Sequence, residues 1–180
     1  MKLLVLFSTF ALGVGTVLHA QTPVAIPADV GTIRDIVRVS YETISGPAGT
    51  PRQWRRDSTL YSPTATFVEL SERDGKTVVA VETPEDYRRK NNTDFVKNGL
   101  IETEIGSHIE RFGNVAVVRS ISVARQAPNG PIEGRWVNYF TLYWDGSRWW
   151  ISGMVWDQER PNNPIPKSWI GVREEKPNRE

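Results

Sequence analysis

Two long apolar runs joined by a tight turn constrain the fold of this chain more than any other feature. The runs are WVNYFTLYW, which starts at Trp136, and WWISGMVW, which starts at Trp149, and Asp145-Gly146-Ser147 connects them. Segments rich in Val, Tyr, Phe and Trp favour strands, and Asp-Gly tolerates the positive φ angles of a tight connection. The pattern predicts a long β-hairpin. Because apolar side chains occupy both of its faces, both faces should be covered.

The first 20 residues have the pattern of a secretory signal peptide. Lys2 supplies a positive charge, an apolar run extends from Leu3 to Val17, and Ala20 places a small residue before an expected cleavage at Gln21. A run of about 15 residues is shorter than the roughly 20 that span a bilayer, although a single membrane anchor is the alternative reading. We therefore expect a secreted or periplasmic protein with no membrane span after removal of residues 1–20.

Charge and residue usage exclude several functional classes. Removing Lys2 from the 22 basic residues leaves 21, which equals the 21 acidic residues, and a neutral chain argues against nucleic-acid binding. The chain has no cysteine, so disulfides, thiolate nucleophiles and thiolate metal sites are excluded. It also has no glycine-rich phosphate loop and no Gly-x-Ser-x-Gly motif. With His108 as the only mature histidine, we expect neither a metal nor a cofactor.

The mature chain reads as one domain with helices in its first half and strands in its second. An extended leader at residues 21–28 precedes the domain, which covers residues 29–158. Helical spacing and capping signals predict helices near residues 29–46, 50–61 and 83–99. Turn signals predict strands at residues 65–70, 77–81, 100–111, 114–125, 132–144 and 148–157. Residues 159–180 are rich in Pro, Asn and charge and predict an extended or disordered tail, in which Trp169-Ile170 can contact the sheet.

Two short segments resemble a known superfamily. Leu60-Tyr61-Ser62-Pro63-Thr64-Ala65-Thr66-Phe67 is similar to the entry of the first strand in nuclear-transport-factor-2-like proteins, and Asp145-Gly146-Ser147-Arg148-Trp149-Trp150-Ile151 is similar to their closing strand. The order of elements over residues 29–158 also resembles the SnoaL-like and ketosteroid-isomerase-like members. The resemblance implies an α+β fold, in which a strongly curved antiparallel sheet of about six strands wraps around about three helices as a cystatin-like cone. It further implies an apolar pocket inside the cone and a homodimer formed through the outer sheet face.

A set of mainly aromatic residues can line such a pocket and bind a small apolar or amphipathic molecule. The alternative for the aromatic members is plain hydrophobic core. Arg119 lies between Val117 and Ile121 on one strand face, where it can bind a ligand carboxylate or pair with a glutamate of a neighbouring strand or subunit. The complete candidate set is Trp54, Tyr61, Tyr87, Phe95, Arg119, Tyr139, Trp150, Met154 and Trp156.

Candidates for catalysis are fewer. Strict alternation along a strand places His108 on one face with Glu102, Glu104 and Glu110, which is either an acid–base site or, as we favour, an exposed polar face. In the isomerase branch, a carboxylate base and a phenol act together inside an apolar cavity. Tyr41 or Tyr61 can supply the phenol. No carboxylate is expected beside them, since the apolar stripe of the first helix has no acid and Asp57 is expected on the outer side of the second helix.

These observations leave three hypotheses. The first is a secreted or periplasmic protein that binds a small molecule or forms a dimeric interaction module. The second is a cofactor-independent isomerase, dehydratase or cyclase, and the third is a structural subunit of an envelope assembly. The orientation of His108 and of the carboxylates distinguishes the first two, because a buried acid facing the pocket favours catalysis. The third predicts a filled cone and large exposed apolar strips.

Overall fold

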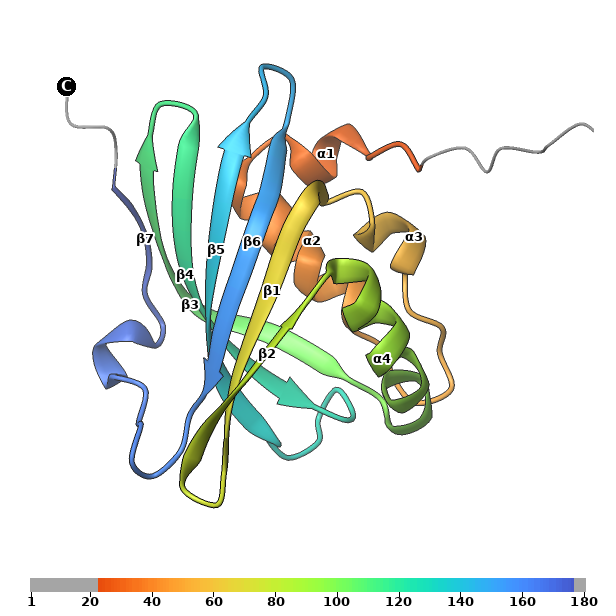
Figure 1. Cartoon of the computed structure of the whole chain (residues 1–180), viewed down its shortest axis with the longest axis vertical. Helices are drawn as coiled ribbons and strands as arrows, with labels where there is room; N and C mark the ends of the chain where they lie inside the picture. Colours follow the sequence, from red (N-terminus) through yellow and green to blue (C-terminus); the bar gives the residue numbers. More distant parts are fainter. Residues whose placement is uncertain (1–22, 177–180) are drawn as a thin grey trace, which may run out of the picture.

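A strongly curved sheet encloses helices on its concave side (Figure 1). The computed structural model describes residues 23–176, so the predicted signal peptide lies outside the described residues. The helices are α1 (Pro27–Val30), α2 (Ile33–Ile44), α3 (Trp54–Asp57), α4 (Pro84–Asn98) and the 3-10 helix η1 (Lys167–Trp169). The strands are β1 (Tyr61–Arg73), β2 (Lys76–Glu82), β3 (Ile101–Phe112), β4 (Val115–Arg125), β5 (Gly134–Trp144), β6 (Trp149–Gln158) and β7 (Arg173–Lys176).

The sheet confirms the expected α+β cone but differs from it in two details. Its strand order is β2-β1-β6-β5-β4-β3-β7, and the pairs β1/β6 and β3/β7 are parallel, so the sheet is mixed and has seven strands. The parallel β1/β6 pair forms because β1 lies beside the last long strand, while α4 carries the chain from β2 to the opposite side at β3. The seventh strand comes from the tail, which adds β7 to the edge of β3.

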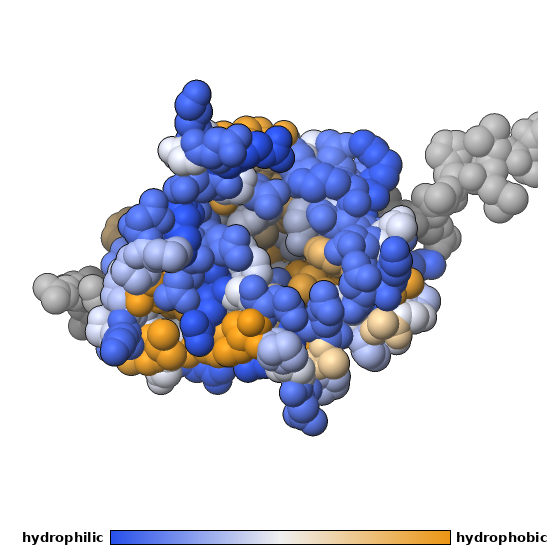
Figure 2. Space-filling model, turned by 90° about the horizontal axis from the view of Figure 1, so that it is seen from below, coloured by the Kyte–Doolittle hydropathy of each residue, from blue (hydrophilic) through white to orange (hydrophobic). Residues whose placement is uncertain are grey.

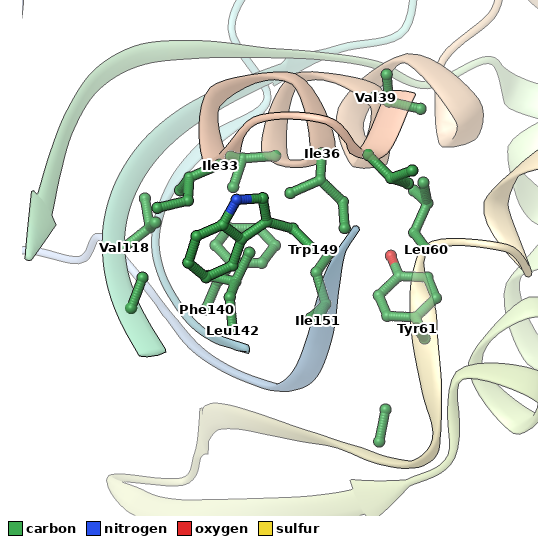
Figure 3. Packing of buried hydrophobic residues seen from close by; sticks show 14 of the residues in the cluster. Ile33, Ile36, Val39, Leu60, Tyr61, Val118, Phe140, Leu142, Trp149 and Ile151 are labelled. Atoms are coloured by element: carbon green, nitrogen blue, oxygen red, sulfur yellow. The ribbon is translucent and has the colours of Figure 1, made fainter. Parts of the chain in front are cut away.

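Helix α2 fills the narrow part of the cone. The Thr32 hydroxyl accepts a hydrogen bond from the Asp35 amide at 3.0 Å and caps the helix, whereas Asp29, where the first predicted helix begins, lies in α1. Ile33 and Ile36 pack against Trp149 and neighbouring residues of β5 and β6 (Figure 3). This packing fixes the face of α2 that carries Tyr41 toward the interior.

Helix α4 covers the wide part of the cone and is held mainly by polar contacts. Of its side chains, only Pro84 is fully buried. Arg88 pairs with Asp57 at 2.9 Å, and Lys90 pairs with Glu82 at 2.9 Å and with Glu69 at 3.3 Å. These ion pairs attach α4 to α3 and to the edge strands, and they fix Tyr87 and Phe95 over the interior.

The segment after β6 runs along the outer side of the sheet. The Gly171 amide donates to the Ile105 carbonyl at 2.7 Å, and the Ser107 amide donates to the Val172 carbonyl at 2.8 Å, so the segment pairs with the edge of β3. The ring of Trp169 lies 3.7 Å from the Arg119 guanidinium. Within residues 23–176, no helix is both long and apolar enough to cross a membrane.

Candidate functional site

A cavity of about 210 Å³ lies inside the wide part of the cone, between the sheet and α4. The space-filling view from below shows a hollow framed by hydrophilic residues, with hydrophobic side chains within it (Figure 2). Polar side chains in its wall include Glu69, Asn91, Glu102 and Asn138. Aromatic side chains predominate, namely Tyr41, Tyr61, Phe67, Tyr87, Phe95, Trp136, Phe140 and Trp156.

The structure brings five of the nine predicted pocket residues together at this cavity. They come from β1, α4 and β6, and they are Tyr61, Tyr87, Phe95, Met154 and Trp156. The candidate phenol of Tyr41 also lies in the wall. The apolar pattern therefore indicates part of the wall, while Phe67, Trp136 and Phe140 are not among the predicted pocket residues.

A bulge in β6 explains why Trp150 lies elsewhere. Leu142 pairs with Ile151 and Thr141 with Gly153, so Ser152 is an extra residue that reverses the alternation of β6. Ile151 before the bulge and Met154 after it therefore both face inward, although their separation is odd. The Trp150 ring lies on the opposite face, where its Nε1 donates to Asp145 Oδ2 at 2.6 Å.

Three other predicted residues also lie outside the cavity wall. Tyr139 alternates with Phe140 and is exposed on the outer face. Arg119 stacks on Trp169 on that same side of the sheet. Trp54 packs beside Phe95, and its Nε1 donates to Asn92 Oδ1 at 2.6 Å, so the ring supports α4 rather than the cavity.

A second bulge, in β3, separates His108 from the glutamates with which the alternation grouped it. Glu104 pairs with Ser122 but Gly106 pairs with Ile121, so Ile105 is the extra residue. Glu102 and Glu104 consequently face inward. His108 faces outward, with Nε2 3.4 Å from Glu110 and Nδ1 3.4 Å from Glu174 of β7.

Glu102 is the carboxylate that the sequence reasoning did not place in the pocket. Its Oε1 accepts a hydrogen bond from Ser122 Oγ at 2.6 Å, and its accessible surface borders the cavity. Burial disfavours the charged form and raises the pKa of Glu102 from 4.5 to about 7, although the Ser122 bond acts in the opposite direction. A half-buried acid flanked by Ser122 therefore faces the pocket, which is the arrangement that favours a chemical role.

A hydrogen-bonded network connects Glu102 to the rest of the inner sheet face. Asn138 Nδ2 donates to Ser122 Oγ and to Tyr41 Oη, both at 3.0 Å. The Tyr41 hydroxyl donates to Ser120 Oγ at 2.8 Å, and Ser120 donates to Glu104 at 2.6 Å. Burial raises the pKa of Tyr41 well above its usual value, so the phenol stays protonated.

Asp57 is buried, contrary to the expectation that it lies on an outer side. Thr43 Oγ1 donates to its Oδ1 at 3.0 Å, and Arg88 Nη1 donates to its Oδ2 at 2.9 Å. The Tyr61 hydroxyl lies 3.4 Å from the same Oδ1. Helical spacing does not reveal this position, because the partner Arg88 lies 31 positions along the chain. Burial raises the pKa of Asp57 despite the Arg88 partner.

Local sequence signals for these departures are few. Gly106 inside a strand pattern is one, because a glycine there often marks a bulge or a close backbone approach. The alternation of Ser120 and Ser122 with Ile121 and Val123 is another, since it indicates a polar inner face. Within residues 23–176, no group of three or more potential metal ligands occurs.

No family profile and no curated protein matches the chain. Among solved structures, it is similar to a protein of unknown function described as NTF2-like from Methylobacillus flagellatus, with 16% identity over 72% of this chain and 95% of that chain and a TM-score of 0.46. A second such protein, from Silicibacter pomeroyi, shows 11% identity over 72% of this chain and 94% of that chain, with a TM-score of 0.48. The CaMKII hub of S. rosetta shows 18% identity over 58% and 81%, with a TM-score of 0.44. The likeness concerns the fold only.

Proposed function

We propose that this is a secreted or periplasmic protein that binds a small, mainly apolar molecule inside the cone, with one polar group of that molecule at Glu102. The observation that carries the proposal is a cavity lined mainly by aromatic side chains, with the Glu102 carboxyl in its wall. The signal-peptide pattern of residues 1–20 supports the compartment.

The volume limits the size of the ligand. A cavity of about 150 Å³ holds benzene, whereas pockets for drug-sized molecules measure about 300–1,000 Å³. At about 210 Å³, this cavity suits a substituted single ring or a compact bicyclic molecule. A four-ring steroid is too large for it unless the walls move.

The polar end of the cavity is formed by groups that still have hydrogen-bonding capacity. In the described part of the chain, neither Glu102 Oε2 nor the Tyr87 hydroxyl has a hydrogen-bond partner. Burial and the charge of Glu102 both raise the pKa of Tyr87 well above its usual value, so the phenol stays protonated. Because both residues line the cavity, a ligand meets at least one donor and one acceptor there.

Binding of p-cresol, followed by amide chemical shifts in NMR spectra, tests the proposal. We expect saturable shifts confined to the elements that line the cavity, namely α2, α4, β1, β3, β4, β5 and β6. Ala124→Leu fills part of the cavity and should weaken binding at least about tenfold, whereas Ala127→Leu adds the same volume in an exposed loop and should have no effect. If Ala124→Leu does not fold, Asn91→Leu fills the same space from α4. Binding that survives a filled cavity contradicts the proposal.

A proton-transfer enzyme is the second candidate, and the pKa of Glu102 favours it. A base that is half ionised near pH 7 suits proton abstraction beside a carbonyl, and Tyr87 can donate to the oxygen that becomes negative. Phenylacetone in deuterated water tests this, since the base exchanges its α-protons. We expect Glu102→Gln to slow protein-catalysed exchange at least about 100-fold. Exchange no faster than in buffer alone excludes this candidate.

We further propose that the protein forms a homodimer through the outer sheet face. Val81, Val68, Val155 and Tyr139 pair in one row across β2, β1, β6 and β5, and Val81 and Val155 are 67% and 41% exposed. Light scattering after gel filtration should give a dimer for the wild type and a monomer for Val155→Lys. Val24→Lys, which changes a valine outside the sheet, should leave the dimer intact. A wild-type monomer contradicts this proposal.

A further inference from the structure

The wall of the cone cavity carries negative charge without a compensating cation. Glu69 and Glu102 both line it, and no lysine, arginine or histidine among the described residues does so. A cavity for a neutral apolar molecule needs no carboxylate, because burying one is unfavourable. The negative charge of the wall therefore favours a positively charged ligand.

The basic side chains closest to the cavity are already engaged. Lys90 binds Glu82 and Glu69, and Arg88 binds Asp57. Arg52 is directed to backbone carbonyl oxygens, including that of Gly46 at 2.8 Å. None of them is available to an anion inside the cavity.

Among the described residues, Glu102 forms no ion pair with a basic side chain. Burial raises the pKa of Glu102 and the hydrogen bond from Ser122 lowers it, and no described lysine, arginine or histidine lines the cavity beside it. Its Oε2 accepts no hydrogen bond from the described residues. A cation in the cavity supplies the missing counter-charge.

The aromatic wall is suited to the same kind of ligand. Phe67, Tyr87 and Trp156 lie with centroids 5.5 to 5.9 Å apart and planes 79° to 82° from one another. The three rings pack edge to face, and all of them line the cavity. Aromatic rings attract quaternary ammonium groups through the negative potential of their faces, and the attraction strengthens when water is excluded.

We propose that the cavity selects a small organic cation, namely an ammonium group with a compact apolar substituent, and that Glu102 is its counter-charge. This inference rests on the proposed binding function of the cone cavity. Glu69 at the rim adds to the field, although Lys90 partly neutralises it. The rings of the wall contact the apolar substituent and the alkyl groups on nitrogen.

Three molecules of closely similar shape but different charge test the proposal. Phenyltrimethylammonium is cationic, tert-butylbenzene is neutral, and benzenesulfonate is anionic. Titrations at about pH 8, where Glu102 is mainly ionised, compare their affinities for the full mature chain. We expect the cation to bind at least about tenfold more tightly than the neutral molecule and the anion to bind most weakly.

Variants connect the selectivity to Glu102. Glu102→Gln should lower the affinity for the cation at least about tenfold and change the affinity for tert-butylbenzene by no more than about twofold. Glu133→Gln removes the same charge from an exposed site and should change neither affinity. Glu69→Gln should weaken the cation by a smaller factor. If the cation and the neutral molecule bind equally well, or if benzenesulfonate binds most tightly, the cation selectivity is wrong but the proposed binding function stands. Failure of all three molecules to bind overturns the proposed binding function as well.

Discussion

The raised pKa of Glu102 makes a quantitative prediction about folding stability. The folded chain binds this proton more tightly than the unfolded chain does, since the pKa rises from 4.5 to about 7 on folding. The folded state is therefore favoured relatively more at low pH, and its free energy of unfolding falls as pH rises from about 4.5 to about 7. The difference in pKa corresponds to about 3 kcal/mol. Above about pH 7, where Glu102 is ionised in both states, the free energy of unfolding is lower by this full amount.

Glu102→Gln isolates this contribution. The amide oxygen of glutamine still accepts the Ser122 bond, but the side chain does not titrate. Relative to the wild type, the variant should gain about 3 kcal/mol between about pH 4.5 and pH 8, or roughly 6–12 °C in Tm. Urea denaturation at a series of pH values measures the difference in free energy of unfolding between the variant and the wild type. The titrations of the other groups cancel in this difference because both proteins contain them.

A flat difference refutes the reasoning. If Glu102→Gln changes stability by the same amount at every pH, the carboxyl is not buried as the structure places it. Glu133→Gln serves as the control, because Glu133 is exposed in the loop before β5. Its effect should stay below about 0.5 kcal/mol throughout the series.

Three further substitutions test the structure around the cavity. Gly106→Ala places a Cβ 2.1 Å from the Trp169 carbonyl oxygen, so the tail should detach from β3. Hydrogen exchange should then be faster at the Gly171 amide, and an unchanged rate contradicts the pairing of the tail with β3. Asp57→Asn leaves Arg88 without its counter-charge and should lower the free energy of unfolding by about 3 kcal/mol, as measured by urea denaturation. A decrease below about 1 kcal/mol means that the pair is not buried. Tyr41→Phe removes the hydroxyl from the inner network and should cost about 1–3 kcal/mol in the same assay, whereas a neutral effect shows that the network is not formed.

The sequence predicts the antiparallel hairpins and part of the aromatic wall because both depend on local patterns, whereas the family resemblance implies the cone. Tyr87 and Phe95 follow helical spacing on α4, and turn signals give the antiparallel pairs but not the parallel pairs β1/β6 and β3/β7. The faces of Trp150 and His108 are not predictable in this way. Each lies next to a bulge whose extra residue reverses the alternation, and the partner strand and the tail, which are distant in sequence, determine where the extra residue falls.

The bulge in β3 also determines what the cavity can do. Without the extra residue at Ile105, uninterrupted alternation places Glu102 and His108 on the same face of β3. With it, His108 lies against Glu110 and Glu174 outside the cone, and Glu102 is left inside with a single hydroxyl donor. A glutamine at this position accepts the same bond without the penalty of about 3 kcal/mol, so the carboxyl contributes something that an amide does not. It can hold a cation or move a proton, and both require the open Oε2. Retention of cation affinity without exchange of α-protons supports binding alone, whereas exchange that disappears in Glu102→Gln supports catalysis.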